Sequence, residues 1–414
     1  MTAGHLRDTI MTTLSDPPRE SFRLSMLLND TRYRSYTFQF IALLCVIALF
    51  SFLGYNLVKN LQAAGLNISY KFLGETSNYD INQTLIDYSS QSTHWRAAVV
   101  GVLNTLLVAF LACVTATIIG VVAGVLRLSK NWLISKLMAV YVEAFRNVPV
   151  LIWIIIIFTV MTAVLPQPRD FRGENATASM WFDAVAFTNR GVYIPKPVLE
   201  SGGMAVVIVF LLSIVGVFAY RRYATKLLYA TGKMLPTGWP TLAILFVPAL
   251  LTYFVLGKPI SLEMPVLAGF NFKGGINILG SLIALWFALA IYTGAFIAEN
   301  VRAGIQAVSR GQTEAAASLG LRPGRIMNLV ILPQALRVII PPLISNYLNI
   351  TKNSSLAIAV GYMDITGTLG GITLNQTGRA IEAILLLMAF YLAISLAISF
   401  IMNIYNSKMK LKER

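Results

Sequence analysis

Charged residues are scarce in this chain of 414 residues: Asp, Glu, Lys and Arg together make up 12%, whereas hydrophobic residues make up 56%. A typical soluble domain carries about 25% charged residues, and a single soluble core stops growing near about 250–300 residues. A soluble globular protein therefore cannot bury this much apolar surface. The hydrophobic content also excludes intrinsic disorder. The composition predicts a protein whose surroundings are largely lipid.

Histidine and cysteine are nearly absent, with two of each in the chain, so the sequence offers no cluster of imidazole or thiol ligands. Cys45 and Cys113 fall inside apolar runs without metal-ligand spacing, which predicts ordinary packing roles. The sequence also lacks the G-x-x-x-x-G-K-[ST] pattern that cradles nucleotide phosphates. From these absences we expect no catalytic residue, no metal site and no cofactor-binding site in this chain.

Eight apolar runs are long enough to cross a bilayer, whose core of about 30 Å requires about 20 mostly apolar residues in a helix. The runs cover residues 36–58, 97–126, 148–165, 203–220, 239–257, 276–298, 338–360 and 381–405. The seventh contains Pro341 and Pro342, so we count it as one proline-interrupted span. The first follows a polar stretch, which predicts a retained anchor and not a cleaved signal. The sequence predicts an all-α polytopic membrane protein with eight transmembrane helices.

The excess positive charge lies on one side of these spans. Most of the net charge of +15 belongs to residues 1–35, 127–147, 221–238, 299–337 and 406–414, which alternate with segments of nearly balanced charge. Because Lys and Arg accumulate in cytoplasmic loops, we predict that both termini are cytoplasmic. These charges border the membrane in separate loops, so they indicate contact with membrane lipid and not a nucleic-acid site.

The predicted cytoplasmic loop 299–337 differs most from its surroundings. Helix formers dominate residues 312–321, Ser309 can cap the start of a helix, and Gly320 can end it. Pro323 predicts a turn before a new apolar stretch. Small residues would let a partner approach this helix closely, and one acid offers a charge; they are Ala315, Ala316, Ala317 and Glu314. The segment is therefore either a short surface helix that binds a partner or a plain solvated connector.

A spaced motif in this loop resembles the EAA loop of ABC-importer permeases. Its residues, in order, are Glu314-Ala315-Ala316, Gly320, Val330 and Leu332-Pro333. The family usually has Ile where Val330 stands. In that family the corresponding helix lies in a groove of the cytoplasmic ATPase subunit and couples the two proteins. The resemblance therefore implies an ATPase-coupling site made of Glu314, Ala315, Ala316, Gly320, Leu332 and Pro333.

Four ordered blocks resemble the polar amino-acid branch of these permeases, the histidine/glutamate/glutamine type. The blocks are Tyr141-x-Glu143-x-x-Arg146-Asn147-x-Pro149, Ala295-x-x-x-Glu299-x-x-Arg302-x-Gly304-Ile305, Leu332-Pro333-Gln334-Ala335 and Lys352-x-Ser354-Ser355-Leu356. The extended N-terminus and a long insertion are most similar to the general L-amino-acid subgroup. The resemblance implies a type I ABC-importer permease core, built from residues 97–165 and the second half of the chain.

The resemblance also divides the chain into parts. A cytoplasmic tail (1–35) and an extra transmembrane helix (36–58) precede a periplasmic loop (59–96), the permease domain (97–405) and a second cytoplasmic tail (406–414). Residues 166–275 are an insertion with a helix pair, relative to the minimal family pattern. The polar loops 59–96 and 166–202 are either docking surfaces for a binding protein, plugs over the pore mouth, or tolerated loop growth.

In this family, transport is the property of a complex. The resemblance implies a non-catalytic permease subunit in the bacterial inner membrane, with ATP and Mg bound by a separate dimer of cytoplasmic ATP-binding subunits. It also implies a second permease subunit, either a paralogue or another copy of this chain, and a periplasmic amino-acid-binding protein. Movement of the ATPases would tilt the spans and open the pathway alternately to either side.

Two acid–base pairs lie near the predicted cytoplasmic ends of spans. Glu143 and Arg146 are three residues apart, as are Glu299 and Arg302, so each pair can form on one helix face. We interpret both pairs as scaffold, because long charged side chains reach the interface cheaply at this depth. A Gly-x-x-x-Gly sequence that starts at Gly120 allows close helix packing, either between subunits or within the chain.

The seventh span contains a polar patch that cannot face lipid, made of Asn349, Thr351, Lys352, Asn353, Ser354 and Ser355. Irregular backbone at membrane depth normally lines a cavity. One hypothesis places Lys352 and its neighbours in the translocation path, where they would meet the carboxylate of an amino acid. The alternative is that Lys352 satisfies freed carbonyls or Asp364 and holds the kink. Asn104, in the second span, is a further candidate for lining the path.

An ion-coupled secondary amino-acid carrier is the main alternative function. It would explain the interrupted span and Lys352 without an ATPase. Such carriers are often built from related repeats, whereas only one EAA-like loop occurs in this sequence. A membrane receptor or scaffold with a large cytoplasmic surface is a third possibility.

Overall fold

The computed structural model describes residues 28, 31–63, 65, 67–173 and 176–409, and it divides into two compact units, Met1–Ser69 and Tyr70–Arg414. Within the described residues, eight helices are long and apolar enough to cross a membrane. The prediction of a mainly helical polytopic protein with eight spans is therefore confirmed. Most of the two predicted tails lies outside the described residues.

The first unit contains the predicted N-terminal span. Helix α2 (Thr31–Ala63) is longer at both ends than the apolar run 36–58 that predicted it. Its side chains are exposed nearly all round; Phe50, for example, has 68% of its surface exposed. A helix that is apolar on every face and buries none of them fits a lipid environment.

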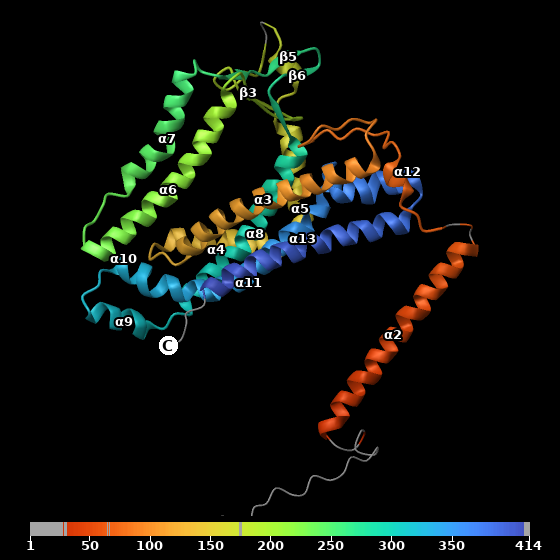
Figure 1. Ribbon diagram of the computed structural model, residues 1–414, viewed down its shortest axis with the longest axis horizontal. Coiled ribbons are helices and arrows are strands. Elements are labelled where there is room, and N and C mark those ends of the chain that lie inside the picture. The colour runs from red at the N-terminus through yellow and green to blue at the C-terminus, as the bar shows by residue number, and fades with distance from the viewer. Residues whose placement is uncertain (1–27, 29–30, 64, 66, 174–175, 410–414) are drawn as a thin grey trace, which may run out of the picture. The chain divides into compact units, whose positions relative to one another are not determined.

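The second unit is a helical bundle with short helices and strands at its ends (Figure 1). Its longer helices are α3 (His94–Arg127), α4 (Trp132–Asn147), α5 (Val150–Val164), α6 (Gly203–Thr231), α7 (Gly238–Val255), α8 (Gly280–Gln306), α11 (Leu332–Asn353) and α13 (Ala380–Met409). Its short helical segments are η1 (Lys71–Gly74), η2 (Pro168–Phe171), α9 (Arg310–Ser318), α10 (Pro323–Ile326), η3 (Met327–Ile331), η4 (Ser354–Val360), η5 (Thr366–Thr373) and α12 (Leu374–Thr377). Helix α4 was not predicted, because it is too polar for a span; the side chain of Asn131 caps its start.

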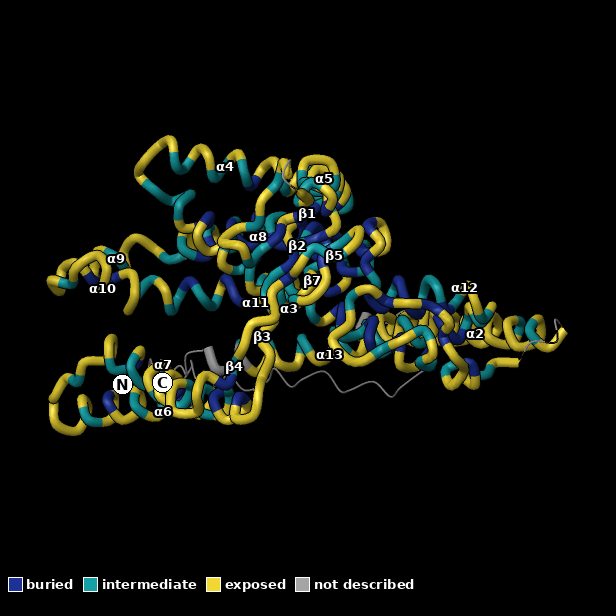
Figure 2. Tube along the Cα trace, turned by 90° about the horizontal axis from the view of Figure 1, so that it is seen from above, coloured by how far each residue is buried: buried dark blue, intermediate teal, exposed yellow. Residues whose placement is uncertain are grey.

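Helix α8 lies at the centre of this bundle and contacts α3, α4, α5 and α11. Buried residues concentrate along α3 and α8, as Figure 2 shows. The two helices approach closely at the predicted Gly-x-x-x-Gly sequence: a Cβ atom on Gly120 would lie 2.9 Å from the carbonyl oxygen of Gly294, and one on Gly124 would lie 2.6 Å from that of Ala298. Small residues let helix backbones meet in this way. The sequence therefore serves packing within the chain.

The predicted insertion contains a pair of antiparallel helices, α6 and α7, which contact each other and lie side by side in Figure 1. Their outward side chains are largely apolar and exposed, for example Phe218 at 69% and Phe254 at 60%. Helix α6 continues past the apolar run 203–220 through Arg221 and Arg222. Both predicted spans are present.

Among the described residues, seven short strands accompany this helix pair, and none of them was predicted from the sequence. They are β1 (Ala186–Thr188), β2 (Gly191–Ile194), β3 (Lys196–Leu199), β4 (Ile260–Glu263), β5 (Val266–Ala268), β6 (Asn271–Lys273) and β7 (Ile276–Leu279). All pair antiparallel, in the order β1-β2-β7, β3-β4 and β5-β6. The predicted span 276–298 therefore begins too early, because its first four residues form β7 and the helix starts at Gly280. We call residues 166–202 and 256–279 the β-region.

The prediction that prolines interrupt the seventh span is wrong. Pro341 and Pro342 lie inside α11, which continues to Asn353. Each proline removes one backbone donor, and α11 as a whole packs against α3, α8 and α13. The regular helix ends instead at Ser354, where a 3₁₀ segment begins, and a π-helical segment follows at Thr366–Thr373.

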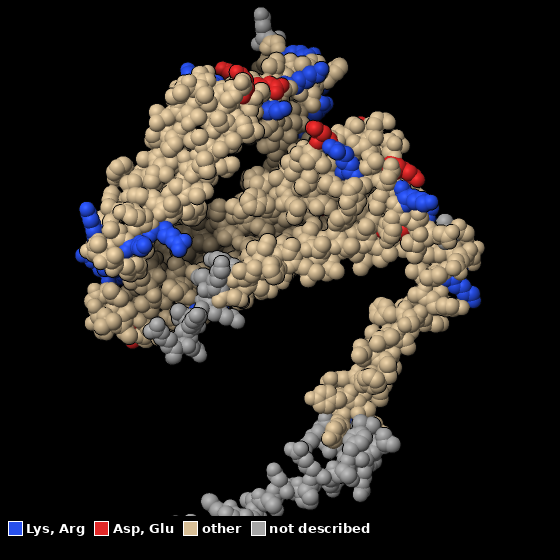
Figure 3. All heavy atoms as spheres, viewed as in Figure 1, with Lys and Arg blue, Asp and Glu red and all other residues tan. Residues whose placement is uncertain are grey.

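Charged side chains of the second unit gather at the two ends of its helices, and the surface between them in Figure 3 is formed by other residues. This distribution matches a bundle whose middle is surrounded by hydrocarbon.

Candidate functional site

Helix α9 occupies the position of the predicted EAA helix, but it spans Arg310–Ser318 and not residues 312–321. Ser309 holds the N-cap position, although its side chain makes no capping hydrogen bond. Gly320 follows with a φ of +74°, and the Gly320 and Leu321 amides donate to the Ala317 and Ala316 carbonyls at 2.9 and 3.4 Å. This hydrogen-bond pattern is the Schellman motif. Gly320 therefore ends the helix, as its sequence position predicts.

One face of α9 packs on the protein and the opposite face is free. Ala316 is buried, at 5% exposure, and α9 contacts α10 and η3. Glu314 and Ala315 are exposed, and Leu319, at the C-cap, has 80% of its surface exposed. A large apolar side chain beside small residues can meet a groove on another protein. The sequence pattern does not single out Leu319, because nothing in a local pattern shows which way its side chain faces.

The chain after α9 is helical, not a simple turn at Pro323. Pro323 is the first residue of α10, a position where its missing amide has no cost. The helical path then runs through η3 into α11, which begins with Leu332 and Pro333. The structure thus places Glu314 to Gly320 on and just after α9, with Leu332 and Pro333 beyond η3. Leu332 is 39% exposed.

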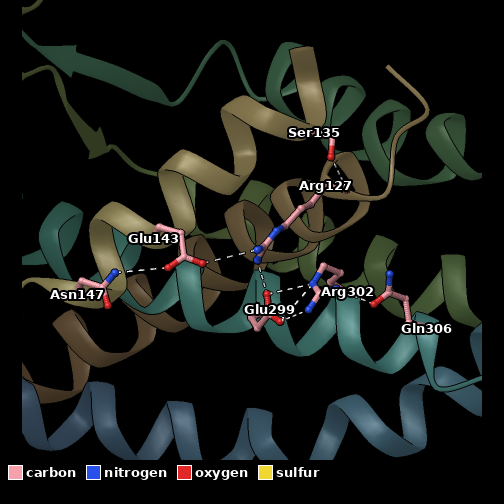
Figure 4. Close-up of polar contacts among 7 residues, drawn as sticks. All are labelled: Arg127, Ser135, Glu143, Asn147, Glu299, Arg302 and Gln306. Atoms are coloured by element: carbon pink, nitrogen blue, oxygen red, sulfur yellow. Dashed lines mark hydrogen bonds and ion pairs between the residues drawn. The ribbon is translucent and has the colours of Figure 1, made fainter. Parts of the chain in front are cut away.

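An ion-pair network ties the helix that precedes α9 to its neighbours (Figure 4). The predicted pair forms: Arg302 Nε lies 3.2 Å from each carboxylate oxygen of Glu299, and Arg302 Nη2 is paired with Oε1. Arg127, the last residue of α3, donates from Nη1 to Glu299 Oε2. Arg302 also donates to Gln306 at 2.7 Å. Glu299 therefore lies between two guanidinium groups, one of them from another helix.

The second predicted pair does not form in the expected way. Glu143 on α4 pairs with Arg127 at 3.8 Å and accepts a hydrogen bond from Asn147 at 3.4 Å. Arg146 instead lies over the ring of Phe296, 5.2 Å from its centre. Arg127 therefore joins α3, α4 and α8, a role that its position in a last helical turn does not reveal. Glu143 and Glu299 thus share Arg127 as a partner, and their role as scaffold residues stays a prediction.

The polar patch of the seventh span lies at the end of α11. Lys352 is exposed and belongs to none of the ion pairs among the described residues. The Ser354 and Ser355 hydroxyls donate to the carbonyls of Thr351 and Lys352, each at 2.8 Å. The two hydroxyls therefore satisfy backbone carbonyls in the last turn of α11. A role of Lys352, Asn353 and these serines in the pathway stays a prediction.

Lys352 is not the partner of Asp364. The Asp364 carboxylate is fully buried and accepts hydrogen bonds from the Tyr391 hydroxyl at 3.2 Å and the Gly367 amide at 2.9 Å. Burial raises the pKa of Asp364 to about 6, although these hydrogen bonds act against the rise. This alternative for Lys352 therefore has no geometric support.

Asn104 is also fully buried and acts as a brace in this structure. Its amide nitrogen donates to the carbonyls of Gln83 and Met363, at 2.8 and 2.9 Å. Its Oδ1 atom is buried with no hydrogen-bond partner. Asn104 thus joins α3 to two segments far from it in sequence, and its place in the pathway stays a prediction. Among the described residues, no three His, Cys, Asp or Glu side chains could together hold a metal ion.

Comparison with known proteins places these features in a family. Residues 220–411 match the family described as "Binding-protein-dependent transport system inner membrane component". The chain is 53% identical to the glutamate/glutamine/aspartate/asparagine transport system permease protein BztB of Rhodobacter capsulatus, over 98% of this chain and all of that protein. It is 43% identical to the general L-amino acid transport system permease protein AapQ of Rhizobium johnstonii, over 95% of this chain and 96% of that one.

A solved structure titled "Crystal structure of an amino acid ABC transporter with histidines" matches with a TM-score of 0.44 and 20% identity, over 76% of this chain and 95% of that one. The match to the relatives extends over essentially the whole chain and includes the helix pair of the insertion. The chain therefore belongs to the family of membrane-embedded ABC-transporter permease subunits that includes these amino-acid permeases.

Proposed function

We propose that this protein forms, with a second permease subunit, the path by which an ABC importer carries polar amino acids across the bacterial inner membrane. The single observation that carries the proposal is α9, a short helix with a fixed end and a free face that displays Leu319. For the substrate, the support is its similarity to BztB, whose name refers to glutamate, glutamine, aspartate and asparagine. The paired names GltJ and GltK among its relatives support a second permease, either a paralogue or another copy of this chain.

The proposed role of α9 is to couple this chain to an ATPase subunit. Glu314 and Ala315 lie on its exposed surface, and Leu319 is the apolar side chain that would enter a groove of the partner. ATP would be bound together with Mg, and hydrolysed, entirely in that partner. The EAA-like residues of this chain would transmit movement and take no chemical step.

The ion-pair network offers a route for that movement. Helix α9 follows α8 after a few residues, and Arg127 joins α8 to the ends of α3 and α4. Displacement of α9 by an ATPase dimer would then tilt three helices as one body, which is the kind of rigid motion that opens a pathway alternately to each side. Neither a proton relay nor an ion gradient is required.

The orientation of the chain in the membrane follows from the proposed role of α9 as the helix that couples to the ATPase. Helix α9 and the basic loops would lie in the cytoplasm with both termini, and the β-region would lie in the periplasm. The exposed Lys352 would then belong to the half of the bundle nearer the periplasm, where it can meet a substrate carboxylate. Replacement of Lys352 by Met tests this part: unchanged affinity and rate of uptake would remove Lys352 from the path.

The test of coupling is capture of the ATPase by the purified permease. Leu319→Asp should abolish capture, because it places a charge where an apolar groove is expected. Met234→Asp is the matched control, because Met234 is 81% exposed in the predicted cytoplasmic segment between α6 and α7. Equal capture by wild type and Leu319→Asp would contradict the proposed role of α9.

A further inference from the structure

Phe270 is held almost entirely in solvent at the tip of a β-hairpin. Strands β5 and β6 pair so that Ala268 faces Asn271, which leaves Gly269 and Phe270 as a two-residue turn. Gly269 supplies the positive φ of +66° that the first turn position requires, as in a type II′ turn. Phe270 has 89% of its surface exposed. We call residues 266–273 the tip hairpin.

The turn is fixed by two arginines from a distant part of the chain. Arg172 donates to the carbonyl of Gly269, and Arg190 donates from Nη1 to the carbonyl of Phe270 at 3.3 Å. Both arginines belong to the segment between α5 and α6, whereas the tip hairpin lies between α7 and α8. Each of the two carbonyls at the turn thus accepts a hydrogen bond from an arginine side chain.

The base of the tip hairpin is anchored by aromatic packing. Phe272 is buried, at 5% exposure, with its ring centre 5.2 Å from that of Tyr193 and 5.3 Å from that of Phe171. The Tyr193 hydroxyl donates to the Asn271 side chain at 2.9 Å. Phe270 lies in the turn and not in a strand, so its side chain is exposed although that of Phe272, two residues later, is buried.

A rigid support beneath an exposed aromatic ring is typical of a binding anchor. Aromatic side chains dominate the energetics of protein interfaces, and an anchor that is already ordered loses little conformational entropy on binding. Acidic and basic side chains are both present in the β-region that carries this ring, for example Glu263 and Lys273, and Figure 3 shows both signs together there. Mixed charge around an apolar centre fits the rim of a protein interface, whereas surfaces that bind anionic lipid are predominantly basic.

The tip hairpin and α9 lie on opposite sides of the membrane. Strand β7 leads into α8 at Gly280, and α9 follows the other end of that helix. The 27 residues of α8 extend for about 40 Å at 1.5 Å per residue, which exceeds the hydrocarbon core of about 30 Å. If α9 faces the ATPase, the tip hairpin faces the side from which substrate arrives.

We propose that Phe270 is the anchor by which this permease captures its soluble substrate-binding protein, inserting into an apolar pocket on that protein. This inference rests on the proposed function, which supplies the binding protein as the partner. Arg172 and Arg190 act as positioning residues: their guanidinium groups donate to the backbone carbonyls of the turn and fix the direction of the ring.

The test uses the complete transporter in proteoliposomes, with ATP hydrolysis measured against the concentration of the purified substrate-binding protein of the same system, loaded with glutamate. Phe270→Ser should raise the half-saturating concentration of that protein at least tenfold and leave basal hydrolysis unchanged. Phe270→Trp should remain within about threefold of wild type, because it keeps an aromatic anchor. Tyr229→Ser is the control, because Tyr229 is 86% exposed at the far end of α6.

A separate measurement tests the positioning role proposed for Arg190. Arg190→Met should raise the half-saturating concentration less than Phe270→Ser does, and Arg190→Lys should restore part of the loss because it keeps a donor. Arg169→Met is the matched control, because Arg169 pairs with Asp170 in the same region and its side chain is 78% exposed. That variant should behave as wild type.

Three results would overturn this proposal. One is an unchanged half-saturating concentration in Phe270→Ser; another is a change in basal hydrolysis alone, which would place the ring in lipid. The third is loss of the second permease from the purified Phe270→Ser complex. Failure of the proposed function is distinguishable, because the wild-type chain would then neither bind an ATPase nor respond to any binding protein.

Discussion

Breaking the contact between Arg127 and Glu299 should measurably loosen the helices that carry α9. Arg127→Met keeps most of the side-chain volume and removes the charge that joins α3 and α4 to α8. The two side chains are largely shielded from solvent, with 17% and 23% exposure. We therefore expect Arg127→Met to lower the folding stability and not only to change the surface potential.

The magnitude follows from geometry and shielding. Two unit charges about 3 Å apart attract by about 5 kcal/mol at an effective dielectric constant near 20, but desolvation offsets most of this, and hydrogen bonds to charged groups contribute about 1.5–3 kcal/mol net. Arg302 still pairs with Glu299 in the variant, so no acid is left alone. We expect Arg127→Met to lower the free energy of unfolding by about 1.5–2 kcal/mol. The contact with Glu143, which is 62% exposed, should add little.

The assay is a double-mutant cycle with Glu299→Gln, measured by unfolding of the purified subunit in mixed micelles. The expected coupling energy is about 1–3 kcal/mol. Cycle analysis of the exposed pair Arg169 and Asp170 provides the control and should give less than about 0.5 kcal/mol. A coupling energy below about 0.5 kcal/mol for Arg127 and Glu299 would refute the reasoning.

Three further predictions concern packing, pH and the end of α9. Gly124→Val should lower the free energy of unfolding by about 1–3 kcal/mol, because even a Cβ atom at this position would lie 2.6 Å from the carbonyl oxygen of Ala298. Gly54→Val is the control and should melt normally in a thermal-shift assay, because no atom lies within 4 Å of a Cβ atom at that position. Since the pKa of Asp364 rises to about 6 on folding, stability should fall by up to about 3 kcal/mol as the pH rises from about 4 to 6; a flat wild-type profile, or an equal fall in Asp364→Asn, would contradict this. Gly320→Ala should weaken capture of the ATPase about fivefold, because a side chain at positive φ costs about 1 kcal/mol, and unchanged capture would show that the α9 end does not matter.

Features that depend on a local backbone requirement were predictable from the sequence. Gly320 ends α9 because a left-handed residue is needed there, and glycine adopts that conformation without strain. Gly120 allows close packing because it has no side chain, whichever helix comes near. The eight spans followed from length and apolar content alone.

Features that depend on distant contacts were not predictable. Strand β7 has four residues, three of them apolar, next to a span, and only its pairing with β2 makes it a strand. Arg127 and Glu143 meet because α4 packs beside α3, which no local spacing encodes. The prolines of α11 carry a strong local signal for a break, yet contacts with neighbouring helices outweigh it, and the break lies at Ser354.

The most direct test of the central claim is uptake of labelled glutamate and glutamine by proteoliposomes that contain this chain, its second permease and the ATPase subunits. The account predicts uptake only with ATP on the ATPase side and binding protein on the other, and its loss in Leu319→Asp but not in Met234→Asp. Uptake driven by an ion gradient without ATP, at the same rate in wild type and Leu319→Asp, would contradict it.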